Sequence, residues 1–205
     1  SYAGPECTGH VPAGAIKAIQ KSYDFKGVVV TASTGDDGWF SWDKVNDGMK
    51  SSESPNIPSS LPQVVSVGGT ALNLNDDATR NNETVWNENG KANSEGIANE
   101  FSQGASGGGC SNYFPAKGWQ SHVANYAKTG CGKLRLAADV SADADPNTGY
   151  DVYTSYNCGT SCPGVPAWEP IGGTSLSSPL IAAMWALAGG AGGIDYPALS
   201  LYGHF

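Results

Sequence analysis

The chain has 205 residues, of which 40% are hydrophobic and 15% are charged. This is enough apolar material for one folded domain with a sizeable core, and it argues against a disordered chain. The formal net charge of −8 disfavours nucleic acid and anionic membranes as partners, because phosphate contacts need clustered Lys and Arg. No apolar run approaches the ~20 residues that span a bilayer.

The first half of the chain predicts a layered α/β fold. Apolar residues recur at helical spacing in residues 13–25, which favours a helix there. The β-branched runs 27–33 and 62–72 are typical of strands buried on both faces of a parallel sheet. Helix, buried strand, loop and buried strand in this order indicate one α/β domain over residues 1–205.

The second half begins with a polar, glycine-rich stretch up to residue 109, which predicts surface loops and short hairpins. Residues 150–156 and 167–174 are expected to form two strands. The clearest helix is predicted over residues 175–190, where Pro179 lies near the first turn and glycines end the apolar run. This segment is apolar nearly all round, so a central position is expected.

The five cysteines contain no CxxC pair, which argues against a zinc ribbon or a thioredoxin site. They are better explained as disulfides of an extracellular, secreted protein. Cys110 is expected to pair with Cys131, and Cys158 with Cys162. Cys7 then remains either as a buried free thiol or as the partner of a cysteine outside these residues.

Ser175 allows two interpretations, a helix N-cap or a nucleophile. A helix N-terminus offers free N–H groups and a dipole that stabilise an oxyanion. Gly172 and Gly173 precede Thr174 and Ser175, and small residues there let a substrate backbone approach closely. From the Thr174-Ser175 pair alone, the N-cap interpretation of Ser175 is favoured.

A nucleophilic serine needs a base, and histidine is the usual one. The three histidines are His10, His122 and His204, and none lies in the His-Gly-Thr context of a subtilisin triad. Each is expected to be a surface or packing residue. A Ser–His–Asp triad is therefore not supported.

Six segments in consistent order resemble the sedolisins (serine-carboxyl peptidases), one of two families that share the Gly-Thr-Ser-x-x-x-Pro segment of subtilisin-like folds. The resemblance implies an α/β, subtilisin-like three-layer fold with a mostly parallel central sheet flanked by helices, closest to a secreted bacterial or fungal branch. The segments are SYAGPE (1–6), VVVTASTGDDG (28–38), LPQVVSVGGT (61–70), SGGGCSNYFPAKGWQ (106–120), ADVSADADPNTGYDVY (138–153) and IGGTSLSSP (171–179).

The resemblance also implies roles. Ser175 would be the nucleophile, activated by a Glu that an Asp orients, and Asp36 would carry the oxyanion hole. An aspartate donates a hydrogen bond only when protonated, so such an enzyme is expected to cleave polypeptides in acid. Gly107 and Gly108 are candidates for binding the substrate backbone, together with Gly173 and Thr174.

The expected Glu and Asp, four residues apart on a helix, have no counterpart in the sequence. The chain is therefore expected to be an incomplete peptidase domain whose base lies on a missing segment or on a second chain of the same precursor. The alternative is a non-catalytic relative with a binding or structural role. Calcium is implied by the resemblance alone, with ligands outside this chain; the acidic run 139–147 is expected to be a turn-rich structural segment. Asn82 begins an N-glycosylation sequon.

Overall fold

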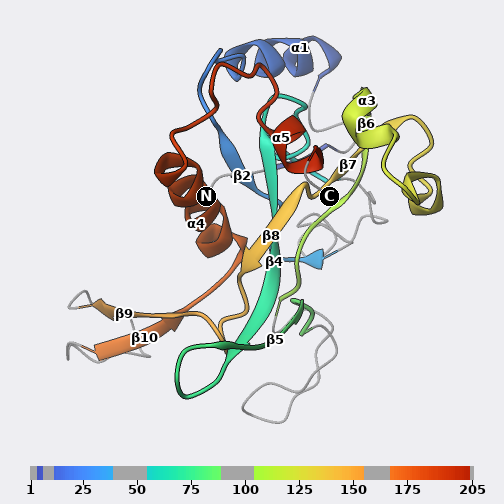
Figure 1. Ribbon diagram of the computed structural model, residues 1–205. Coiled ribbons are helices and arrows are strands. Elements are labelled where there is room, and N and C mark those ends of the chain that lie inside the picture. The colour runs from blue at the N-terminus through green and yellow to red at the C-terminus, as the bar shows by residue number, and fades with distance from the viewer. Residues whose placement is uncertain (1–3, 7–11, 39–54, 89–103, 155–166, 204–205) are drawn as a thin grey trace.

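The structure is a computed structural model that describes residues 4–6, 12–38, 55–88, 104–154 and 167–203 (Figure 1). Its central sheet has four strands, with β4 in the middle. β4 pairs in parallel with β2 and β8 and antiparallel with β5, so the sheet is mostly parallel, as predicted. The strands are β2 (Thr31–Ser33), β4 (Val65–Leu74), β5 (Arg80–Val85) and β8 (Val140–Asp143).

Side chains on β2 alternate between two faces of the sheet, as the strand period of two requires. Thr31 Oγ1 and Ser33 Oγ both donate to carbonyls of the long helix α4 (Thr174–Leu187), at 3.1 and 2.7 Å. Ala32 between them joins a cluster that includes Ile16 of helix α1 (Ala13–Ser22). Helices therefore flank the sheet, and Figure 1 shows α4 beside β2 and β4.

Two apolar clusters make up the core. One contains Ile16 and packs against Ile19 and Tyr23, which confirms the helical spacing seen in the sequence. The other joins β4 to α4 through Val65, Val67 and Ile181. Within the described residues, no helix is long and apolar enough to cross a membrane.

Smaller elements surround the sheet. The predicted pair of strands at 150–156 and 167–174 is confirmed as an antiparallel ribbon. Two further antiparallel pairs and three short helices complete the described chain. The remaining strands are β1 (Gly4–Pro5) with β3 (Asn56–Ile57), β6 (Gly109–Pro115) with β7 (Leu134–Ala137), and β9 (Tyr150–Thr154) with β10 (Ala167–Ile171). The short helices are α3 (Gly118–Ser121), η2 (Tyr126–Thr129) and α5 (Ala198–Tyr202).

Four details differ from expectation. β2 is shorter than 27–33, and Val28 is 53% exposed because the chain there is not yet in the sheet. The run 139–147 begins as strand β8 before it turns. α4 begins at Thr174 rather than at the serine, with Gly173 as its N-cap. Its outer face is not buried, since Leu187 is 90% exposed.

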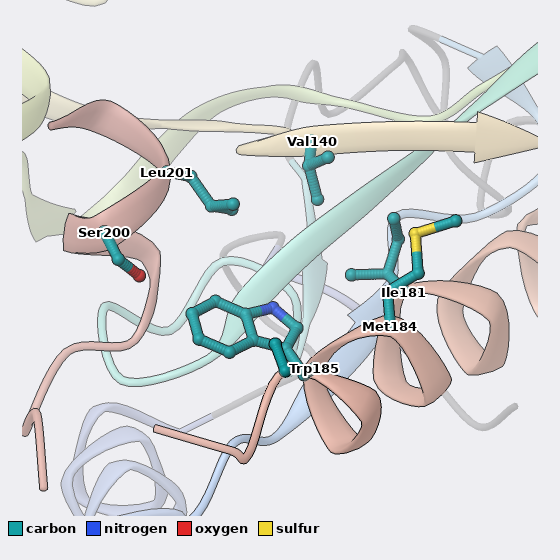
Figure 2. Close-up of a pocket in the computed structure, with 7 residues that line it drawn as sticks. Val140, Ile181, Met184, Trp185, Ser200 and Leu201 are labelled. Carbon is teal, nitrogen blue, oxygen red and sulfur yellow. The ribbon is translucent and has the colours of Figure 1, made fainter. Parts of the chain in front are cut away.

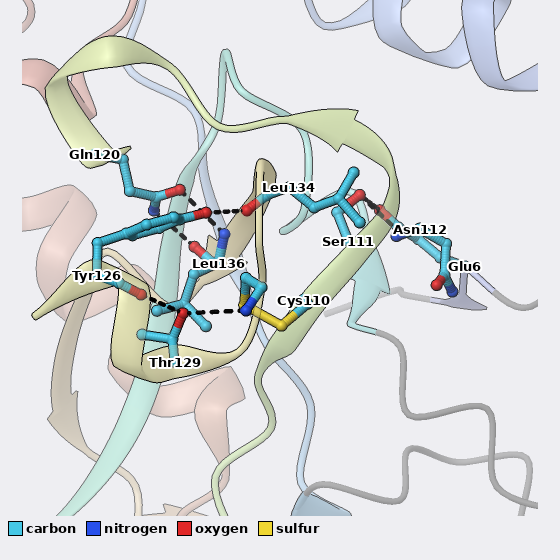
Figure 3. Close-up of a disulfide and its surroundings, with 10 residues drawn as sticks. Glu6, Cys110, Ser111, Asn112, Gln120, Tyr126, Thr129, Leu134 and Leu136 are labelled. Atoms are coloured by element: carbon cyan, nitrogen blue, oxygen red, sulfur yellow. Dashed lines mark hydrogen bonds between the residues drawn. A yellow bond between two sulfur atoms is a disulfide. The ribbon is translucent and has the colours of Figure 1, made fainter. Parts of the chain in front are cut away.

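The predicted disulfide between Cys110 and Cys131 is confirmed (Figure 3). It joins β6 to the loop before β7, and its Cα atoms are 5.2 Å apart. Cys7, Cys158 and Cys162 lie outside the described residues.

Candidate active site

A turn of two glycines, Gly172 and Gly173, connects the end of β10 to the start of α4, just before Ser175. Gly173 in this turn has φ of +83°, a conformation that L side chains rarely adopt. A Cβ added there would also lie 2.8 Å from Oδ2 of Asp36. Glycine is therefore needed at this position, and it lets the turn lie directly against the aspartate.

Asp36 lies just beyond the end of β2 and binds the first residue of α4. Its Oδ1 accepts hydrogen bonds from the backbone N–H of Thr174 at 2.7 Å and from Thr174 Oγ1 at 2.8 Å. Thr174 Oγ1 in turn accepts from the N–H of Gly35 at 3.0 Å, and its carbonyl accepts from Ser33 Oγ at 2.7 Å. Thr174 is only 1% exposed, so these contacts fix the helix start against the strand end.

Ser175 is the second residue of α4, and it is exposed. Among the described residues, its Oγ has no hydrogen-bond partner. The backbone N–H groups of a first helical turn also have no acceptor within the helix. At this helix start, Thr174 N–H already donates to Asp36, and Leu176 N–H donates to the carbonyl of Gly173. The exposed hydroxyl of Ser175 thus lies on a backbone that these hydrogen bonds hold in place.

The two neighbouring aspartates differ in their surroundings. Burial, and then the nearby carboxylate of Asp36, raise the pKa of Asp37. With Oδ1 of Asp36 occupied by Thr174, its Oδ2 is the oxygen that lies over Gly173.

The glycine-rich segment before β6 runs alongside the loop of Asp36. Ala105 N–H donates to the carbonyl of Asp36, and Gly107 N–H donates to that of Gly35, both at 2.8 Å. A Cβ on Gly107 would overlap the carbonyl oxygen of Thr34. The structure thus brings Gly107 close to Asp36, and close backbone packing is one reason for a glycine there.

Gly108 also has little space for a side chain, because an added Cβ would lie 3.0 Å from the carbonyl oxygen of Ala137. It borders the same segment, and its binding of a substrate backbone stays a prediction. The peptide bond from Ala137 to Ala138 is cis.

Other candidate residues lie apart from this site. His122 is exposed at the end of α3, while His10 and His204 lie outside the described residues. Asn82 is exposed on β5, and its Oδ1 accepts a hydrogen bond from Asn73 at 3.1 Å. Its glycosylation stays a prediction.

The acidic residues around β8 do not gather into a metal site. Asp139 pairs with Arg135 at 2.6 Å, and Asp143 accepts from Leu72 N–H and from Thr148 Oγ1. In the part of the chain that the structure describes, no group of three or more His, Cys, Asp or Glu could hold a metal ion. Calcium is thus implied by the resemblance alone.

An apolar pocket of about 470 Å³ lies between α4, β8 and α5 (Figure 2). Trp185 occupies its middle in this view, with Met184 on the same helix and Leu201 on α5. Its lining carries neither a carboxylate nor Ser175, so it is separate from the candidate active site.

Sequence reasoning missed the carbonyl of Ala144, which accepts the N–H of Gly173 at 2.6 Å. It also missed the buried pair of Arg135 and Asp139. A charged pair at i and i+4 is a common surface pattern, so its spacing alone gave no signal of burial.

Comparisons with known proteins identify the family of this chain. Residues 4–192 match the model of the subtilase family, and the chain therefore belongs to that family. Its relatives include sedolisin and kumamolisin, which confirms the resemblance to the sedolisins that the sequence predicts. Sedolisin of Pseudomonas sp. (strain 101) is 34% identical over 86% of this chain, and kumamolisin of Bacillus sp. (strain MN-32) is 34% identical over 91%.

A solved structure is also similar. Pseudomonas sedolisin, a serine-carboxyl proteinase complexed with two molecules of pseudo-iodotyrostatin, matches with a TM-score of 0.69 and 31% identity over 93% of this chain. The likeness confirms the subtilisin-like α/β fold. This chain spans 47% of that solved chain, and 27% and 29% of the two curated relatives.

Proposed function

We propose that this chain carries the nucleophile and the oxyanion site of an acid-acting serine endopeptidase. The observation that supports the proposal most directly is the contact of Asp36 with Thr174, which puts a carboxyl group beside the turn of Ser175. Family membership supports peptide-bond hydrolysis as the reaction.

In the proposed mechanism, Ser175 Oγ attacks the carbonyl carbon of the scissile peptide bond while a base takes its proton. The tetrahedral oxyanion then accepts hydrogen bonds from protonated Oδ2 of Asp36 and from the N–H of Ser175. The proton passes from the base to the leaving amine as the C–N bond breaks. Water hydrolyses the acyl-enzyme by the same route and frees Ser175.

The base is the Glu of a Glu–Asp pair that residues 1–205 do not contain, so this role falls to another segment or chain of the enzyme. Asp36 must stay protonated while the Glu ionises, which requires acid. We expect an optimum below about pH 5, from ordinary carboxyl pKa values. The disulfide of Cys110 and Cys131 supports an extracellular site of action.

The substrate is an extended polypeptide that passes Gly107 and Gly108, which are partly exposed. Gly173 and Thr174 are buried, so in this proposal they support the cleft from beneath. Gly107 and Gly173 both lie against the Asp36 loop, which is what a shared substrate cleft would need. If calcium binds the enzyme, its ligands belong to residues other than the described ones.

The test is cleavage of a reduced, alkylated polypeptide between pH 3 and pH 8 by the full-length protein that contains these residues. We expect cleavage in acid that Ser175→Ala abolishes and that pseudo-iodotyrostatin inhibits. Activity at pH 8 with none at pH 4 would contradict the acid mechanism. A protein that binds the polypeptide and cleaves it at no pH would instead be the non-catalytic relative.

A further inference from the structure

The turn after β8 lies directly against the turn of Ser175. The carbonyl of Ala144 accepts the N–H of Gly173 at 2.6 Å. A Cβ added to Gly172 would lie 2.5 Å from that same carbonyl oxygen and 2.5 Å from the nitrogen of Pro146. Gly172 is thus packed onto residues 144–146 with no room for a side chain, and Gly173 is hydrogen-bonded to the same turn.

Ala144 itself has little freedom to move. It is fully buried, and its N–H donates to the carbonyl of Thr70 on β4 at 2.8 Å. A Cβ on Gly69, the preceding residue of β4, would lie 2.7 Å from the Cβ of Ala144. The position of the Gly173 N–H is therefore set by the central strand through Ala144.

Asp143 fastens this turn to β4. Its side chain is almost fully buried, at 5% exposure of the residue, and Oδ1 accepts from Leu72 N–H at 3.1 Å and from Thr148 Oγ1 at 2.8 Å. Thr148 closes the other end of the turn, where its N–H donates to the carbonyl of Asp145 at 3.0 Å. One carboxyl oxygen thus joins the central strand to both ends of the turn.

We infer that Asp143 is a positioning residue for the proposed nucleophile, acting through the carbonyl of Ala144 and the N–H of Gly173. The inference rests on the proposed role of Ser175. The side chain of Asp143 is buried and bonds to Leu72 and Thr148, so its loss should misplace Ser175 without removing a substrate contact.

The chain offers matched variants. Asp143→Leu removes the acceptor at similar volume, whereas Asp143→Asn keeps an oxygen that can accept from Leu72 and Thr148. Asp77→Ala is the control, because Asp77 Oδ1 accepts from the N–H and Oγ1 of Thr79 in the same way, but in an exposed hairpin. Thr148→Val is a milder second variant in case Asp143→Leu does not fold.

Two measurements on the full-length protein separate the inference from the proposed function. The first is amide hydrogen exchange at Gly173, followed by NMR, which needs no activity. Protection of this N–H should fall about 10-fold or more in Asp143→Leu, beyond any fall at core amides such as Val67, and stay near the wild-type value in Asp143→Asn and Asp77→Ala.

The second measurement is polypeptide cleavage in acid. Asp143→Leu should lower kcat by about 10- to 100-fold with KM little changed, since small misplacement of a nucleophile is costly, and Asp143→Asn should restore it. Unchanged protection of Gly173 and unchanged kcat in folded Asp143→Leu or Thr148→Val would overturn the inference. An inactive wild type would overturn the proposed function, while the exchange result would still decide whether Asp143 fixes the turn.

Discussion

Oδ1 of Asp36 accepts two hydrogen bonds from one residue, Thr174, through its backbone N–H and its side-chain hydroxyl. The two residues are 138 positions apart in the sequence. One belongs to the loop after a central strand and the other begins the helix of Ser175. This contact joins the loop after β2 to the start of α4. Oδ2 of Asp36, the other carboxyl oxygen, lies next to Gly173.

Thr174→Val tests how much this contact stabilises the fold. Valine has nearly the same shape, but it loses the hydroxyl that donates to Asp36 and accepts from Gly35. We expect the free energy of unfolding to fall by about 1–3 kcal/mol, because buried partners are left unpaired. Thr79→Val, which removes an exposed hydroxyl bonded to Asp77, should change it by less than about 0.5 kcal/mol. Urea denaturation measures both, and equal effects would mean that the Asp36 contact contributes little.

Substitutions of Asp36 test its role as a hydrogen-bond donor. An Asn side chain can accept from Thr174 through its oxygen and donate from its nitrogen at every pH. Asp36→Asn should therefore retain activity toward higher pH than the wild type, while Asp36→Ala should lower kcat by about 10²–10³-fold. The measurement is the pH profile of kcat for the full-length protein. Identical profiles for the Asn and Ala variants would exclude donation by residue 36.

Much of the fold was predictable from local patterns in the sequence. Helix α1 follows from the helical spacing of its apolar residues, and the sequence also predicts the two strands of the β9–β10 ribbon and the pairing of Cys110 with Cys131. The exact start of α4 was not, because a serine is a common N-cap and glycine fills that position here. The nearness of Ser175 and Asp36 was suggested only by family segments.

The polar contacts that hold the site had no signal in the sequence. Hydrogen bonds such as those of Asp143 with Leu72 join residues 71 positions apart, and polar residues at such separations have no shared period. The burial of Arg135 could not be predicted from the sequence either, because charged residues are almost never fully buried unless they are paired. Burial and pairing are properties of the assembled fold.

Gly107→Ala tests whether the glycine-rich segment is needed for packing. The new methyl group would overlap the carbonyl oxygen of Thr34, a buried residue whose N–H donates to the carbonyl of Val67. We expect a loss of about 1–3 kcal/mol in the free energy of unfolding. Gly14→Ala is the control, since a Cβ there meets no atom within 4 Å and alanine favours α1 by roughly 0.5–1 kcal/mol. A neutral Gly107→Ala with raised KM would instead assign this glycine to substrate binding alone.

The buried ion pair of Arg135 and Asp139 permits a test against a surface pair. Asp139 also accepts from Ser66 N–H and Tyr202, and Arg135 donates to the carbonyls of Ser60 and Val64. Arg135→Met leaves a buried carboxylate without its counter-ion.

We expect this change to cost about 3–5 kcal/mol of unfolding free energy. Arg80→Met, which breaks an exposed pair with Glu83, should cost less than about 1 kcal/mol. Thermal or urea denaturation of both variants checks the prediction, and similar losses would contradict it.

Glu6 gives a prediction about pH. Its side chain is fully buried next to β6, where it accepts from Ser111 Oγ at 2.8 Å and from Asn112 N–H at 2.6 Å (Figure 3). Burial raises the pKa of Glu6 above its ordinary value of 4.5, against the opposing effect of these hydrogen bonds and of Arg135. Between pH 4.5 and the raised folded pKa, Glu6 therefore keeps its proton in the folded state, whereas in the unfolded chain it has lost it.

With a folded pKa above the unfolded one, the contribution of Glu6 to stability is fully present below about pH 4.5 and is lost as pH rises through the folded value. Glu6→Gln resembles the protonated acid, so it should flatten the decline in unfolding free energy above pH 4.5. The control is Asp76→Asn, on an exposed turn, which should leave the slope unchanged. Urea denaturation from pH 4 to pH 8 gives the dependence of unfolding free energy on pH for each variant. If the wild type gains stability over this range, and Glu6→Gln shows the same slope, then Glu6 does not titrate as its burial requires.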